Sequence, residues 1–89
     1  MDQLKIGRVE VTNAVRQEIE ETYGFQEFCM YCVREHRAKD WGDLVAKEGT
    51  VLKSVYDIPK QFCLGYVSQI EVTTNAERNE TLVSFPGDD

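Results

Sequence analysis

The chain has 89 residues, of which 42% are hydrophobic and 29% charged, and its net charge at pH 7 is −6. A chain of this length closes one hydrophobic core, so we expect a single compact domain over residues 1–89, with a short frayed tail from about residue 86. No apolar run approaches the ~18 residues that cross a membrane, and residues 1–11 lack the zones of a secretory signal. The composition therefore predicts a cytoplasmic protein without membrane contact, and the acidic charge disfavours binding to nucleic-acid phosphates.

The first predicted elements are a strand and a helix. Apolar and polar residues alternate over residues 5–11, which is the period of a half-buried strand. Thr12 offers an N-cap hydroxyl, Val15, Ile19 and Tyr23 follow at i, i+4 and i+8, and Gly24 is a natural stop. We expect the charged side of this helix to face solvent.

A second, longer helix is predicted over residues 25–36. Apolar residues recur there at i, i+3, i+4 and i+7, which places them in one continuous stripe. The run Ala-Lys-Asp-Trp-Gly-Asp at residues 38–43 then predicts a corner, in which Asp40 caps a short further helix that ends at Gly49.

The rest of the chain has the period of strands. We predict strands over residues 51–58, 62–73 and 81–85, with a twist or bulge near Gly65 and a polar turn over residues 75–79. Short connections favour an antiparallel meander. The predicted fold is therefore α+β, with an N-terminal strand and helix, a main amphipathic helix, and a three-stranded antiparallel meander packed on the helices.

The cysteines allow two interpretations. Cys29 and Cys32 have the spacing of a metal-binding pair, and His36 and Cys63 would complete a Cys3His set that zinc accepts. However, the pair lies within a helix and on its apolar stripe, and free cysteine behaves as a small buried hydrophobic group. We therefore predict reduced, packed thiols with no metal and no cofactor, and a small zinc-binding protein remains the alternative.

The single histidine also has two interpretations. His36 lies one helical turn before Asp40, so the two could form an acid–base pair. No nucleophile motif, glycine-rich phosphate loop or paired carboxylates accompany them, and we predict that the protein is not an enzyme. Instead we expect the imidazole to fix the helix end by hydrogen bonding near Asp40 or Trp41, with Trp41 buried between the helices and the sheet.

Several segments resemble a family of small proteins from bacterial plasmids, phages and conjugative elements. Members of that family carry a His-x-x-x-Asp-Trp-Gly-Asp signature and are often mislabelled type I restriction subunit M. The matching segments are His36, Asp40-Trp41-Gly42-Asp43-Leu44, and residues 7–12, 51–56, 70–73 and 81–86. Lys39 departs from the family's glycine, and residues 45–50 lack its polar helical insert. His36, Asp40, Trp41, Gly42 and Asp43 form the structural motif of this resemblance.

The resemblance implies a mobile-element accessory protein that acts by protein–protein binding in the bacterial cytoplasm. We expect an inhibitor of a host defence nuclease, either a CRISPR effector (an anti-CRISPR) or a restriction enzyme (an anti-restriction protein). Its partner would be a host or element protein with a basic surface, because carboxylates can occupy a nuclease's basic groove. The candidate contacts are Glu18, Glu20, Glu21, Glu77, Glu80, Asp88 and Asp89.

A DNA-binding regulator encoded by a mobile element is the alternative in another functional class. The middle of the chain has nearly balanced charge and contains most of the basic residues. Those that would contact DNA are Arg34, Arg37, Lys39, Lys53 and Lys60.

Overall fold

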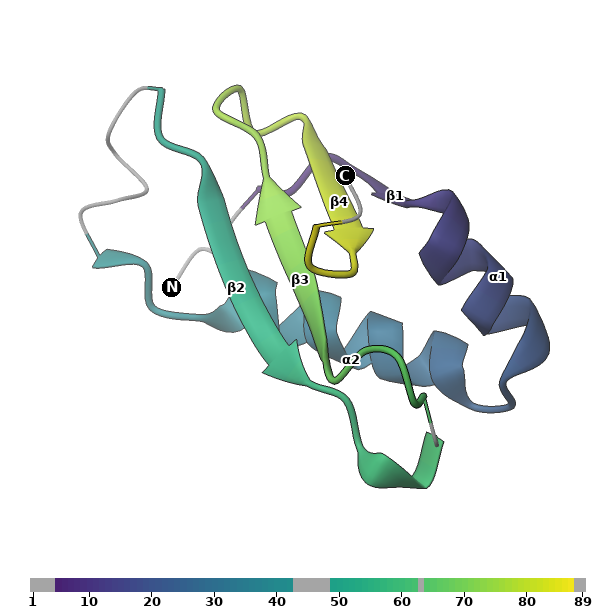
Figure 1. The fold of residues 1–89 in the computed structure, drawn as a ribbon. Coiled ribbons are helices and arrows are strands. Elements are labelled where there is room, and N and C mark those ends of the chain that lie inside the picture. The colour runs from purple at the N-terminus through teal and green to yellow at the C-terminus, as the bar shows by residue number, and fades with distance from the viewer. Residues whose placement is uncertain (1–4, 43–48, 63, 88–89) are drawn as a thin grey trace.

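The computed structural model describes residues 5–42, 49–62 and 64–87, which form a four-stranded mixed sheet with two helices packed against it (Figure 1). In chain order the elements are β1 (Arg8–Val11), α1 (Asn13–Glu21), α2 (Phe25–Ala38), β2 (Leu52–Asp57), the 3-10 turn η2 (Lys60–Phe62), β3 (Gln69–Thr74) and β4 (Glu80–Ser84). The predicted α+β class is confirmed. No described helix is long and apolar enough to span a bilayer.

The sheet contains one more strand than the predicted meander. Its order is β1-β4-β3-β2, and β2, β3 and β4 are antiparallel neighbours as predicted. The correction concerns β1, which pairs in parallel with β4 so that Arg8 lies opposite Glu80 and Val11 opposite Val83. Alternation of apolar and polar residues indicates that a strand is half buried, but it does not indicate which strand lies beside it. The pairing of β1 with β4 was therefore missed.

A glycine permits the approach of β1 to the rest of the sheet. Gly7 has a φ of 64°, and a Cβ at this position would lie 2.1 Å from the backbone carbon of Asn79. The N–H of the next residue, Arg8, donates to the Asn79 carbonyl oxygen at 3.0 Å. Glycine adopts this backbone conformation without a steric cost and, having no Cβ, leaves the necessary space.

The two helices begin as predicted, but α1 ends at Glu21, so Tyr23 lies beyond the helix and is exposed instead of lying on its buried side. Thr12 caps α1, because its Oγ1 accepts a hydrogen bond from the Val15 N–H at 3.4 Å. The backbone N–H of Thr12 donates to Val83 of β4 at 3.1 Å, which joins the start of the helix to the sheet. Gly24, with a φ of 83°, turns the chain directly from α1 into α2.

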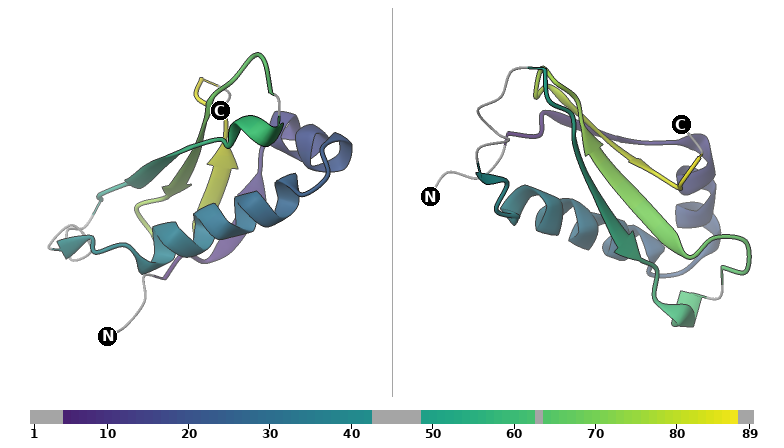
Figure 2. Two further views of the ribbon diagram at one scale, coloured as in Figure 1. Left: turned by 90° about the horizontal axis from the view of Figure 1, so that it is seen from below. Right: turned by 60° about the vertical axis from the view of Figure 1, so that its left-hand side comes forward.

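Helix α2 supplies the centre of the core. Phe25, Cys29, Cys32 and His36 are all buried and follow one another at i, i+4, i+7 and i+11, which confirms the predicted stripe. The helix lies across one face of the sheet (Figure 2). The inward side chains that it meets on the strands are Ile70, Val72 and Val83.

The segment before β3 differs from the prediction. The strand predicted over residues 62–73 begins only at Gln69, and Gly65 lies in a turn and not in a bulge. Phe62 ends η2 and places its ring edge-on to Phe25, with the centroids 5.5 Å apart. The apolar residues that resembled a strand are therefore used for packing and not for sheet pairing. The predicted turn over residues 75–79 is present.

The other face of the sheet has no described helix against it. Residues 53, 55 and 57 of β2 point to this face, as do their neighbours on β3 and β4. The short helix predicted to end at Gly49 lies outside the described residues, as does Cys63. Among the residues that the structure describes, the sheet therefore has one covered face and one open face.

Candidate functional site

A buried polar network links α2 to three strands. The His36 side chain is fully buried, with Nδ1 2.6 Å from Ser54 Oγ and Nε2 2.8 Å from Thr74 Oγ1. Thr74 Oγ1 lies 2.7 Å from Thr81 Oγ1, and the Thr81 hydroxyl donates to the carbonyl oxygen of Ile6 at 2.7 Å. The network thus runs from the helix through the sheet to the segment before β1.

The order of donors in this network fixes the tautomer of His36. The Ile6 carbonyl can only accept, so the Thr81 hydroxyl donates to it. The oxygen of Thr81 then accepts from Thr74, and the oxygen of Thr74 accepts from Nε2–H of His36. Nδ1 is left as the acceptor of the Ser54 hydroxyl. Every hydrogen-bonding group of the neutral imidazole therefore has a partner.

Burial keeps this imidazole uncharged near neutral pH. Burial lowers the pKa of His36 from 6.5 to about 4, and the positive charge of Lys39 acts in the same direction. A proton on Nδ1 would displace the hydrogen bond that Ser54 donates. The ring is also closed to solvent, so it holds the fold together and does not reach a substrate.

The sequence did not reveal the partners of His36. We expected the ring to hydrogen bond near Asp40 or Trp41, whereas it bonds to Ser54 and Thr74. The available signal was weak: hydroxyl side chains occupy inward strand positions that alternation assigns to apolar residues. Thr81 was missed for the same reason.

The predicted corner closes the end of α2. Asp40 Oδ1 accepts from the backbone N–H of Gly42 at 3.0 Å, and Trp41 Nε1 donates to the backbone carbonyl of His36 at 2.9 Å. The Trp41 ring stands edge-on to the imidazole at 5.0 Å, and Lys39 Nζ lies 5.1 Å from the tryptophan ring centroid. Trp41 is only partly buried, which corrects the prediction of a buried ring. Asp43 lies outside the described residues.

The two described cysteines are packed thiols. Cys29 and Cys32 are buried, and burial raises the pKa of each to about 12, so both are protonated at neutral pH. No three histidine, cysteine, aspartate or glutamate side chains among the described residues gather in a way that could hold a metal. His36, which the zinc interpretation requires, already uses both of its ring nitrogens.

The acidic candidates lie at two ends of the sheet. Glu18, Glu20 and Glu21 are on α1, which directly follows the end of β1. Glu77 and Glu80 lie in the turn before β4 and at its first residue. Because β1 and β4 run in parallel, α1 is at the opposite end of β4 from these two residues. Asp88 and Asp89 lie outside the described residues.

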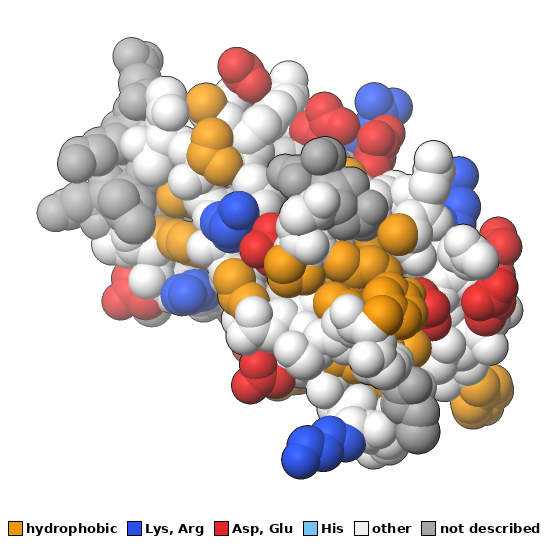
Figure 3. Space-filling model, in the orientation of Figure 1, with side chains coloured by type: hydrophobic (Ala, Val, Ile, Leu, Met, Phe, Trp, Pro, Cys, Tyr) orange, Lys and Arg blue, Asp and Glu red, His pale blue; other side chains and the backbone are white. Residues whose placement is uncertain are grey.

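The α1 carboxylates form the acidic surface at one side of the molecule, which Figure 3 shows at the right-hand edge. Glu20 and Glu21 are exposed, while Glu18 is partly buried and held in position. Tyr66 donates its hydroxyl to Glu18 Oε1 at 2.5 Å, and Thr22 donates to Oε2 at 2.9 Å. We call Glu18, Glu20 and Glu21 the α1 acidic surface.

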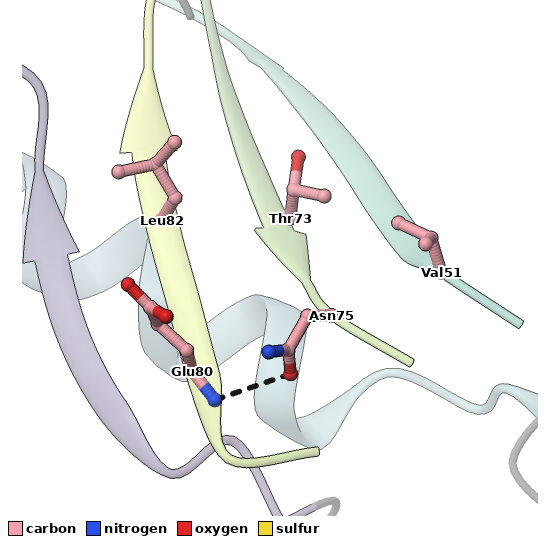
Figure 4. A pocket seen from close by; sticks show the side chains of 5 residues that line it. All are labelled: Val51, Thr73, Asn75, Glu80 and Leu82. Carbon is pink, nitrogen blue, oxygen red and sulfur yellow. Dashed lines mark hydrogen bonds between the residues drawn. The ribbon is translucent and has the colours of Figure 1, made fainter. Parts of the chain in front are cut away.

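The second acidic end borders a shallow hollow of about 340 Å³ on the open face (Figure 4). Its lining residues come from β3, β4 and the chain next to β2 and β3, and are Val51, Thr73, Asn75, Glu80 and Leu82. The backbone N–H of Glu80 donates to Asn75 Oδ1 at 3.2 Å, which fixes the rim. The lining combines two apolar side chains with one hydroxyl, one amide and one carboxylate, which are groups that can contact another protein surface.

The basic candidates do not form one continuous surface. Arg34, Arg37 and Lys39 lie near the C-terminal end of α2. Lys60 starts η2, whose Phe62 packs on Phe25 at the other end of that helix. The remaining candidate, Lys53 on β2, pairs with Glu71 at 3.4 Å. A DNA-binding surface requires a stripe of free cations, and this distribution does not favour one.

No protein-family model, curated protein or solved structure that we compared with this chain matches it. The relation to the plasmid and phage family therefore stays a prediction from the quoted segments.

Proposed function

We propose that this protein acts by binding another protein, and that it serves a mobile element by inhibiting a host defence nuclease in the bacterial cytoplasm. The α1 acidic surface is the observation that supports this proposal. It presents two exposed carboxylates beside one that Tyr66 and Thr22 hold in place. A CRISPR effector or a restriction enzyme offers the complementary basic groove.

The arrangement favours electrostatic attraction to such a groove. Three carboxylates and one arginine on a short helix give it a net negative charge, and a basic cleft attracts such a surface across several ångströms of solvent. The histidine and the two described thiols are buried in unreactive forms, so these three side chains offer no reactive group to a partner.

A plasmid-challenge assay tests the proposal. Cells that carry one defined CRISPR effector or restriction enzyme receive a plasmid with its target site, with and without this protein. We expect the protein to raise plasmid survival. The double variant Glu20→Lys, Glu21→Lys should reduce this protection at least about tenfold, because both carboxylates are exposed and the two lysines would be repelled by a basic groove.

Glu77→Lys compares the α1 acidic surface with the second group of candidate contacts, because it reverses an exposed acid at the opposite end of β4. It should retain most of the protection. Equal protection by the double variant and the original chain would contradict the role of the α1 acidic surface. Failure to protect against any nuclease, together with a shift of duplex DNA at low salt, would instead favour the DNA-binding regulator.

A further inference from the structure

Strand β2 is an edge strand of the described sheet. It lies at the left-hand side of the sheet in Figure 1, and no described strand pairs with its outer side. Val55, at the centre of β2, is 46% exposed. An exposed edge with an apolar centre is a template for pairing with a further strand.

The hydrogen bonding of β2 shows which groups it offers. The N–H of Ile58 donates to the Ser68 carbonyl of the chain before β3 at 2.9 Å. Backbone groups of successive strand residues point to alternate sides, so the even-numbered residues of β2 face β3. Lys53, Val55 and Asp57 therefore direct their backbone N–H and C=O groups outward.

The three outward residues are complementary to themselves. If a second β2 runs antiparallel with Val55 opposite Val55, then Lys53 of each copy lies opposite Asp57 of the other. Directly opposed side chains of opposite charge stabilise a strand pair, and two facing valines add apolar contact. The three opposed pairs would exchange about six backbone hydrogen bonds.

Other registers of the same two strands are poorer. A shift that places Val55 opposite Lys53 puts Asp57 opposite Val51 and leaves the charges without partners. A shift that places Val55 opposite Asp57 puts Lys53 opposite Pro59, which has no N–H to donate. A shift that centres on Lys53 or on Asp57 opposes like charges. One register therefore satisfies both the backbone and the charges.

The neighbouring surface fits the same pairing. A groove of about 350 Å³ separates α2 from the edge of β2, and Tyr31, Glu35 and Tyr56 belong to its lining. Tyr31 is 47% exposed. A twofold axis through Val55, perpendicular to the sheet, places the α2 helices of both copies on the same side, so the second copy would cover part of this groove.

The other sheet edge is less suited to pairing. Strand β1 has four residues and runs through Thr12 into α1, and Thr12 and Arg8 direct their N–H groups to β4. Only Val9 and Val11 of this strand face outward.

We propose that the protein forms a symmetric homodimer in which β2 pairs antiparallel with β2 of a second copy, joining two four-stranded sheets into one. The pairing leaves α1 exposed at both outer ends. It does not depend on the proposed inhibition of a nuclease.

The mass of the full chain in solution, measured by light scattering and by sedimentation over a range of concentrations, tests the dimer. We expect twice the mass of one chain. Val55→Pro should raise the dimer dissociation constant at least about tenfold, because it removes two outward N–H donors at the twofold axis and leaves the β2–β3 hydrogen bonds intact. Its circular dichroism should match that of the original chain.

A pair of charge variants tests the register. Asp57→Lys gives a chain with two lysines at the edge, and Lys53→Asp gives a chain with two aspartates. Each alone should be a monomer, and an equimolar mixture should form a heterodimer. The proposal is overturned if the original chain stays monomeric at millimolar concentration, if Val55→Pro leaves the dimer unchanged, or if the mixed variants do not associate.

Discussion

The two ends of α2 meet the sheet through different chemistry. At the N-terminal end, Phe25 packs among other aromatic rings, with Phe62 edge-on at 5.5 Å and Phe85 at 6.2 Å. At the C-terminal end, His36 connects to the strands by short hydrogen bonds between buried polar groups. The apolar end gains its stability from contact area, whereas the polar end requires that each donor has an acceptor. Substitutions and pH changes should therefore lower the stability of the two ends for different reasons.

The largest effect is expected at the apolar end. Phe25→Ala removes a fully buried ring and should lower the free energy of unfolding by about 3–5 kcal/mol. Phe25→Leu, which keeps most of the volume, should cost about 1.5 kcal/mol. Urea unfolding followed by circular dichroism measures both. Equal losses would show that volume at this site does not determine stability.

Acid should weaken the polar end specifically. Between pH 6.5 and pH 4 the unfolded chain binds a proton at His36 that the folded chain excludes, because the folded pKa is about 4. Stability is therefore complete above pH 6.5 and falls as the pH drops, by about 3 kcal/mol at pH 4. Urea unfolding at several pH values measures this slope.

His36→Gln is the control for the pH experiment, since it cannot take up the proton while the carboxylates of the chain still titrate. The difference between the two pH profiles isolates His36. If the free energy of unfolding of both proteins changed equally with pH, folding would not lower the pKa of His36.

A smaller effect is expected further along the network. Thr81→Val leaves the Ile6 carbonyl and the Thr74 hydroxyl without their partner and should cost about 2 kcal/mol. Thr73→Val is a matched threonine change on the open face and should cost less than about 0.5 kcal/mol. Thermal unfolding compares them. Similar midpoints for the two variants would contradict the proposed hydrogen-bond chain.

The smallest effect is expected at the thiols between the two ends. Cys32→Val replaces one small apolar group with another and should cost about 1 kcal/mol. In the folded protein, Cys29 and Cys32 should react with iodoacetamide only as fast as the chain unfolds, which mass spectrometry can follow. Release of a bound metal by Cys32→Val would show that the cysteines hold an ion.

The same contrast explains what could be predicted from the sequence. The stripe from Phe25 to His36 repeats at helical spacing, so the position of α2 and its buried face were correct. The partners of His36 lie 18 and 38 residues away, and no local pattern connects a histidine to hydroxyls at such distances. Long-range polar contacts depend on strand register, which the sequence alone did not supply.

The candidate surface was limited in the same way. Glu20 and Glu77 were grouped by charge, and the structure separates them to opposite ends of β4. A single sequence gives the number of charges but not their distances. The self-complementary order of Lys53, Val55 and Asp57 was visible in the sequence, yet it acquired meaning only when the outward direction of these residues was known.

The parallel pairing of β1 with β4 also has a consequence for how the chain folds. Arg8 lies opposite Glu80, which is near the other end of the chain. Strand β1 is therefore synthesised long before the strand with which it pairs. Contacts that close large loops slow the folding reaction, because the entropy of closure is lost before the contact forms. We therefore expect β2, β3 and β4 to assemble first, and the docking of β1 to be the late step that completes the native state.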